Sequence, residues 1–151
     1  MSDKQNRFFQ TADERFGTSR HRSCSLAVLV ECVVSPLLRE HPTPILFELN
    51  VPIDLVTTTD QGKLADVVRS LVKSSLEQMT EGGELTVTGC QTSHGVELEI
   101  ADTGGDLDSR GHKFSIAVAA LGCKPQWQSC PQGGVAVTLT LPFQDSVRKA
   151  A

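Results

Sequence analysis

Apolar residues recur at helical spacing in two segments of the chain. In residues 25–40 and 61–79 an apolar side chain returns every three to four positions, which is typical of amphipathic helices. Ser25 and Asp60 stand at the starts of these segments and are candidate N-caps. Pro36 removes a hydrogen bond from the first helix, so we expect a kink or an early end there. One face of the second helix gathers Leu64, Val67, Val68, Leu71, Val72 and Leu76.

Shorter apolar or alternating runs predict strands in the rest of the chain. They occupy residues 44–51, 81–91, 95–102, 124–130 and 133–142. The second and third runs meet around "TSHG", and the last two meet at Pro131 to Gly134, which predicts two hairpins. A short apolar segment, "KFSIAVAALG", predicts a third helix that stops at Gly122.

This order of elements predicts an α/β fold. Helices that alternate with strand pairs are typical of a two-layer α/β sandwich, with the helices on one face of a mixed, mainly antiparallel sheet. The alternation inside the strands indicates that one sheet face is wetter than the other. We expect one domain at residues 25–143, an N-terminal tail at 1–24 and a C-terminal tail at 144–151. The first tail is either mobile or a short helix docked by Phe8, Phe9 and Phe16.

Charge and hydropathy exclude several classes of function. The net charge is -4 and the pI is near 5.5, which argues against a nucleic-acid partner. The longest apolar run, residues 26–38, is too short to span a membrane and carries Glu31 and Pro36. No apolar signal core opens the sequence, so we expect a cytoplasmic protein with no membrane partner.

The cysteines give no sign of a disulfide framework or a zinc site. Their number is odd and no C-x-x-C spacing occurs, so we expect reduced and mostly buried thiols. They are Cys24, Cys32, Cys90, Cys123 and Cys130.

Three segments, taken in order, resemble the ATP-binding domain of sensor histidine kinases in the GHKL superfamily. They are "DQGKLADVVRSLVKSSLEQMTEGGELTV", "ELEIADTGG" and "GGVAVTLTLP". The resemblance extends over about residues 25 to 143. It implies the Bergerat fold of histidine kinase-like ATPases, a pocket for ATP or ADP with Mg²⁺, and a role in two-component signalling.

On the long helix, the resemblance places serines where the family carries its catalytic side chains. A typical member has an Asn that ligates Mg²⁺ and, one turn earlier, a Glu or His that organises the proton. These positions align with Ser74 and Ser70. A serine hydroxyl is a poor ligand for a hard cation and is not a base at neutral pH without a partner. The alternative interpretation is that both serines are merely polar positions on the wetter edge of a helix.

The glycine boxes of the family are only partly retained. Asp102 and Gly104 match the D-x-G-x-G box, in which the Asp accepts a hydrogen bond from adenine, but Asp106 replaces its second glycine. An ordinary strand-ending turn would also explain these residues. Gly111 matches the first glycine of the next box, whereas Lys113 replaces the second. Only "LDSR" separates the two boxes, so the lid of the family is essentially deleted.

These losses favour a degenerate, stand-alone histidine-kinase-like ATP-binding domain that is non-catalytic, a pseudokinase. It would act as a signalling module that binds a partner protein, with vestigial nucleotide contacts from Asp102, Gly104, Ser74, Ser70 and Gly111, and with ATP or ADP binding weak or lost. The alternative is an active ATPase or kinase that phosphorylates a partner, and a third is an α/β domain with an accidental resemblance. None of the four histidines has the context of a phosphoacceptor, so autophosphorylation in cis is not expected.

Overall fold

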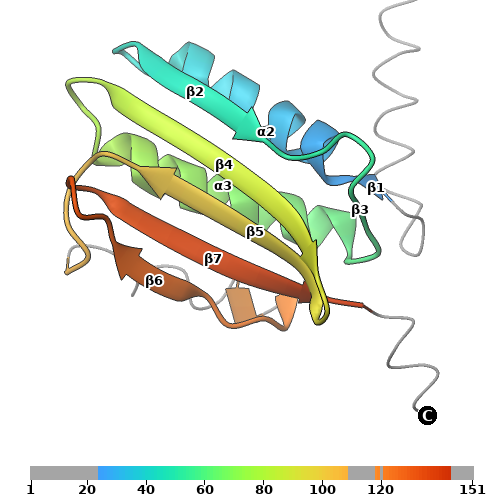
Figure 1. The fold of residues 1–151 in the computed structure, drawn as a ribbon. Coiled ribbons are helices and arrows are strands. Elements are labelled where there is room, and N and C mark those ends of the chain that lie inside the picture. The colour runs from blue at the N-terminus through green and yellow to red at the C-terminus, as the bar shows by residue number, and fades with distance from the viewer. Residues whose placement is uncertain (1–23, 109–117, 120, 144–151) are drawn as a thin grey trace, which may run out of the picture.

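A five-stranded sheet, covered on one face by two long helices, forms the body of the protein (Figure 1). The computed structural model describes residues 24–108, 118–119 and 121–143. The strand order is β2-β4-β5-β7-β6. β2 and β4 are parallel, and the other neighbours are antiparallel, which confirms the predicted fold class. The strands are β2 (Ile45–Asn50), β4 (Gly83–Thr92), β5 (Gly95–Asp102), β6 (Gln126–Ser129) and β7 (Val135–Pro142).

The first helix, α2 (Leu26–Glu40), begins as predicted but does not end early. The side chain of Ser25 caps it by accepting a hydrogen bond from the backbone N–H of Val28 at 3.4 Å. Pro36 lies inside the helix, which continues to Glu40, so the expected early end is wrong. Apolar residues on both sides of the proline pack in or against the core, and this packing outweighs one lost hydrogen bond. They are Val33, Val34, Leu37 and Leu38.

The second helix, α3 (Gln61–Glu77), supplies the centre of the core. The six apolar residues that define its predicted face are each at most 5% exposed. They pack against the inward-facing side chains of β4, β5 and β7, which alternate with more exposed residues along each strand. The predicted helix face and the predicted wetter face of the sheet are therefore both confirmed.

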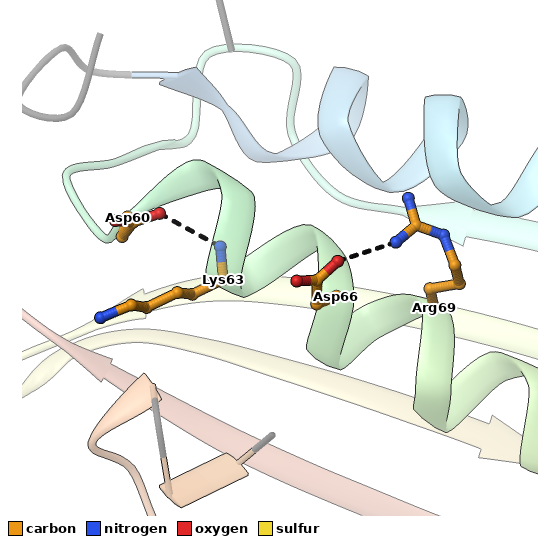
Figure 2. Close-up of polar contacts among 4 residues, drawn as sticks. All are labelled: Asp60, Lys63, Asp66 and Arg69. Atoms are coloured by element: carbon orange, nitrogen blue, oxygen red, sulfur yellow. Dashed lines mark hydrogen bonds and ion pairs between the residues drawn. The ribbon is translucent and has the colours of Figure 1, made fainter. Parts of the chain in front are cut away.

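Asp60 caps α3, and a surface ion pair lies one turn further along (Figure 2). The Asp60 carboxylate accepts a hydrogen bond from the backbone N–H of Lys63 at 3.1 Å. Arg69 donates to Asp66 at 2.9 Å, and both of these side chains are exposed. The two aspartates differ in role, since one satisfies a helix N–H group and the other pairs with a solvated cation.

Asp60→Ala is expected to lower the free energy of unfolding by about 1 kcal/mol, because the N–H of Lys63 loses its acceptor. The matched control Asp66→Ala is expected to cost less than about 0.5 kcal/mol, because exposed ion pairs contribute little. Urea unfolding of both variants measures the difference. Equal losses would show that the cap does not stabilise α3.

Besides the continuation of α2 through Pro36, two features of the fold differ from the sequence-based expectations. A two-stranded sheet of β1 (Cys24–Ser25) and β3 (Val56–Thr57) was not predicted, since strands of two residues leave no periodic signal. The expectation of mostly buried cysteines is wrong, because all five lie in the described part of the chain and each is half-buried or exposed. Cys32 lies on the outer face of α2, and Cys90 lies on the open face of β4.

The third predicted helix, at residues 113–122, falls mostly outside the described residues. Val118, Ala119 and Leu121 are helical, and the chain leaves this helix at Gly122, whose φ is +80°. A positive φ is readily adopted by glycine, which agrees with the predicted stop. Within the described ranges, the helices are too short or too polar to cross a membrane.

Candidate functional site

Asp102 ends the central strand of the sheet, on the face that the helices cover. Along β5, Val96, Leu98, Ile100 and Asp102 are buried, and the residues between them are partly exposed. Asp102 therefore points to the same side of the sheet as α3. Its side chain is only 4% exposed, and Oδ1 accepts a hydrogen bond from the backbone N–H of Gly104 at 3.0 Å.

The turn after Asp102 packs closely against the end of α3. Thr103 Oγ1 accepts a hydrogen bond from the backbone N–H of Glu84 at 3.0 Å and lies 3.7 Å from Met79 Sδ. A Cβ atom added to Gly104 would lie 2.5 Å from the carbonyl oxygen of Gln78 and 2.7 Å from Met79 Cγ. Gly104 is thus required by a contact between backbones within the protein, independently of any ligand.

Ser70 and Ser74 lie on the edge of α3 that leads to this turn. Ser70, Ser74 and Gln78 are all half-buried and follow one another at intervals of four residues, which places them along one side of the helix. Gln78 is the residue that contacts Gly104 and Gly105. Ser74 is therefore one helical turn, about 6 Å along the axis, before the contact with the glycine turn. The fold thus brings Ser70 and Ser74 to the helix edge that meets the turn after Asp102.

Sequence reasoning missed Gln78 and Gly134 at this site. Gln78 continues the four-residue spacing of Ser70 and Ser74, and that spacing was the available signal. Gly134 has a φ of +94°, and a Cβ atom there would collide with the carbonyl oxygen of Asp102. The start of β7 can approach the end of β5 only because this residue has no side chain.

A pocket of about 270 Å³ lies beside Asp102, on the opposite face of the sheet from the helices. Glu84, Thr86 and Ala101 line it from the open sheet face, together with the turn at residues 130–133. This pocket is therefore separate from the side of the sheet on which the Asp102 carboxylate and α3 lie. Burial raises the pKa of the Cys130 thiol at its rim, and the negative charges of Asp102 and Glu99 raise it further.

One predicted site residue, Gly111, lies outside the described part of the chain, and so does Lys113, which replaces the second glycine of that box. Among the described residues, no group of three or more His, Cys, Asp or Glu side chains could hold a metal ion.

This combination of sheet order and helix placement is the fold of the catalytic, ATP-binding domains of histidine kinases. A nucleotide-free catalytic domain of histidine kinase ThkA matches with a TM-score of 0.65 and 16% identity, over 80% of this chain and 94% of that chain. The ATP-binding domain of PrrB from Mycobacterium tuberculosis matches with a TM-score of 0.62 and 16% identity, over 82% and 98% of the two chains.

A third similar structure is histidine kinase ThkA in complex with the response regulator protein TrrA. It matches with a TM-score of 0.66 and 17% identity, and it covers 96% of this chain but 50% of the ThkA chain. The sequence matches no protein-family model and no curated protein. At these levels of identity the likeness establishes the fold, and the activity has to be argued from the residues of the site.

Proposed function

We propose that this chain is a degenerate, stand-alone histidine-kinase-like ATP-binding domain that does not catalyse phosphoryl transfer. Residues 25–143 carry this role, and residues 1–24 and 144–151 are tails. The domain acts as a signalling module that binds a partner protein. It uses the histidine kinase fold as a scaffold rather than as an enzyme.

The observation that carries the proposal is the pair of serines on the edge of α3. Ser70 and Ser74 are half-buried on the same side of the helix as Gln78, which contacts the turn after Asp102. This edge offers two hydroxyl groups where the resemblance implies a proton organiser and an amide ligand of Mg²⁺. Hydroxyls are weaker ligands than carboxylate or amide oxygens for such a cation. The residues present therefore do not fit a metal-bound triphosphate.

The shortened connection after Asp102 supports the same conclusion. Four residues separate "DTGGD" from Gly111, which leaves little chain for a lid that could close over a nucleotide. Lys113 replaces a glycine that would allow close backbone approach to phosphate. The Asp106 carboxylate adds a negative charge to the same segment, which disfavours a triphosphate.

One observation favours the alternative of an active nucleotide-binding domain that phosphorylates a partner. Asp102 is retained at the end of the central strand and faces the side of α3. A carboxylate in this place has the chemistry to accept a hydrogen bond from an adenine amino group. However, its Oδ1 already accepts the N–H of Gly104, which gives Asp102 a structural role without nucleotide.

The proposed partner is a signalling protein. Histidine kinase ThkA, which shares the fold, has been solved in complex with a response regulator protein. A response regulator or another phosphorelay protein is therefore the first class of partner to test. We propose neither a nucleic acid nor a membrane as a partner.

Calorimetric titration with ATP and with ADP, each with and without Mg²⁺, tests the proposal. We expect no saturable heat in the micromolar range, and we expect Mg²⁺ to make no difference, because the serines give it little to bind. Saturable micromolar binding that strengthens with Mg²⁺ and is lost in Ser74→Ala would contradict the proposal. Binding without a Mg²⁺ effect would leave a pocket for adenine alone and would still exclude the kinase chemistry.

A further inference from the structure

Three residues with exposed apolar side chains have their backbones close together around Ser25, where the described chain begins. Val28 on α2 is 41% exposed, Ile53 in the loop before β3 is 71% exposed, and Val56 in β3 is 47% exposed. Ser25 joins them, since its Oγ donates to the carbonyl oxygen of Ile53 at 3.0 Å and accepts from the N–H of Val28 at 3.4 Å. Ser25 is also the strand partner of Val56. We call Val28, Ile53 and Val56 the N-terminal patch.

The patch is unusual for this protein. Among the described residues, only one further large apolar side chain is as exposed, Leu46 on the edge strand β2. Single exposed apolar residues are ordinary, but a contiguous group commonly marks a surface that something covers. Figure 1 shows β1 and β3 side by side at the N-terminal end of α2, so the patch lies where residues 1–23 join the domain.

The sequence of residues 1–23 suits this surface. The segment contains Phe8, Phe9 and Phe16, which are three of the six phenylalanines in the chain. Phe16 precedes Cys24 by eight residues, and eight extended residues reach up to about 27 Å. The aromatic side chains can therefore return to the patch without any change in the domain.

The distribution of charge also favours residues 1–23 as the segment that covers the N-terminal patch. Residues 1–23 contain five Lys or Arg and three Asp or Glu, whereas the whole chain has a net charge of -4. Residues 1–23 therefore carry a net positive charge, and residues 24–151 carry a larger negative charge than the full chain. Two exposed acidic side chains border the patch: Glu31, three residues after Val28 on α2, and Asp54, directly after Ile53. The arginines of residues 1–23 could therefore pair with the carboxylates of Glu31 and Asp54, which lie on two sides of the patch.

From this placement we propose that residues 1–23 bind back onto the N-terminal patch, with phenylalanine side chains covering Val28, Ile53 and Val56. The interaction is independent of any nucleotide.

Limited trypsin digestion of the full chain tests the proposal, because the segment carries its own cleavage sites, including Arg15 and Arg20. Ile53→Asp is expected to increase the rate of cleavage at these sites about fivefold or more, since cleavage follows the population of the open form. The matched control Leu46→Asp changes a similarly exposed apolar residue on β2 and is expected to leave the rate unchanged. Cleavage products are followed by mass spectrometry.

A second variant keeps the test independent of the fold of the domain. Replacement of Phe8, Phe9 and Phe16 by Ser alters only the segment and is expected to accelerate cleavage as Ile53→Asp does. Equal rates in wild type and both variants would overturn the proposal. A wild-type dimer in sedimentation experiments that dissociates in Ile53→Asp, with no change in cleavage, would overturn it in favour of a second copy covering the patch.

Discussion

Purified protein is expected to release no phosphate from γ-labelled ATP above background, and to carry no label on its own chain. The expectation rests on the proposed function, in which this chain lacks several groups that the reaction would need. Ser74 would be a poor ligand for a metal ion, and Ser70 would not organise a proton without a base beside it. Lys113 and the short connection between Asp106 and Gly111 would disfavour close contact with a triphosphate. Phosphoryl transfer depends almost wholly on such positioning and charge stabilisation.

The expected effect is large because each of these interactions would act in the transition state of the reaction. Each missing interaction that acts in the transition state costs about 2–4 kcal/mol, and each 1.4 kcal/mol is a factor of ten in rate. Loss of two such interactions lowers the rate by about a thousandfold or more, which brings turnover below the background of an ordinary assay. None of the four histidines has the context of a phosphoacceptor, so the proposal also predicts no label on the chain.

The measurement compares phosphate release and chain labelling in the wild type, in Ser74→Ala and in Asp102→Ala. Ser74 is half-buried on a helix edge, so its replacement by alanine is expected to leave the fold intact. Turnover in the wild type that disappears in Ser74→Ala would restore an enzyme. Loss of turnover in Asp102→Ala would restore an enzyme as well, whereas equal turnover in the wild type, Ser74→Ala and Asp102→Ala would indicate a contaminating ATPase.

Leu71→Ala is expected to lower the free energy of unfolding by roughly 2–5 kcal/mol. Leu71 is 2% exposed in the middle of α3, and it belongs to the same core as Val87, Leu98 and Val137 of the central strands. Truncation removes apolar contacts and leaves a cavity that rigid strands cannot fill. The loss is a large fraction of the stability of a domain of this size.

Leu46→Ala provides the matched control, because it makes the same chemical change at a leucine that is 65% exposed. Its expected cost is less than about 0.5 kcal/mol, as for surface substitutions in general. Urea unfolding of both variants gives the comparison. A loss below about half a kcal/mol for Leu71→Ala would show that the inward face of α3 has been assigned wrongly.

The sequence by itself determined those elements whose signal is local. The 3.6-residue period of α3, the capping residues Ser25 and Asp60, and the turn residues of the two hairpins each depend on neighbours a few positions away. For this reason the boundaries of α2, α3 and the strands agree closely with the sequence-based ranges. The alternation along β5 also fixed the direction of Asp102, because a period of two assigns each residue to one face of a sheet.

Tertiary structure decided the features that join distant segments. Pro36 signals a break locally, yet packing on both sides of it carries α2 through to Glu40. Gly104 resembles a residue kept for a nucleotide, but its close contact with Gln78, 26 positions earlier, is reason enough for a glycine. The pairing of β1 with β3, and with it the exposed group around Ser25, follows from a meeting of segments about 30 residues apart. Such contacts depend on how distant segments pack together in one core, and this packing is not encoded in any local sequence pattern.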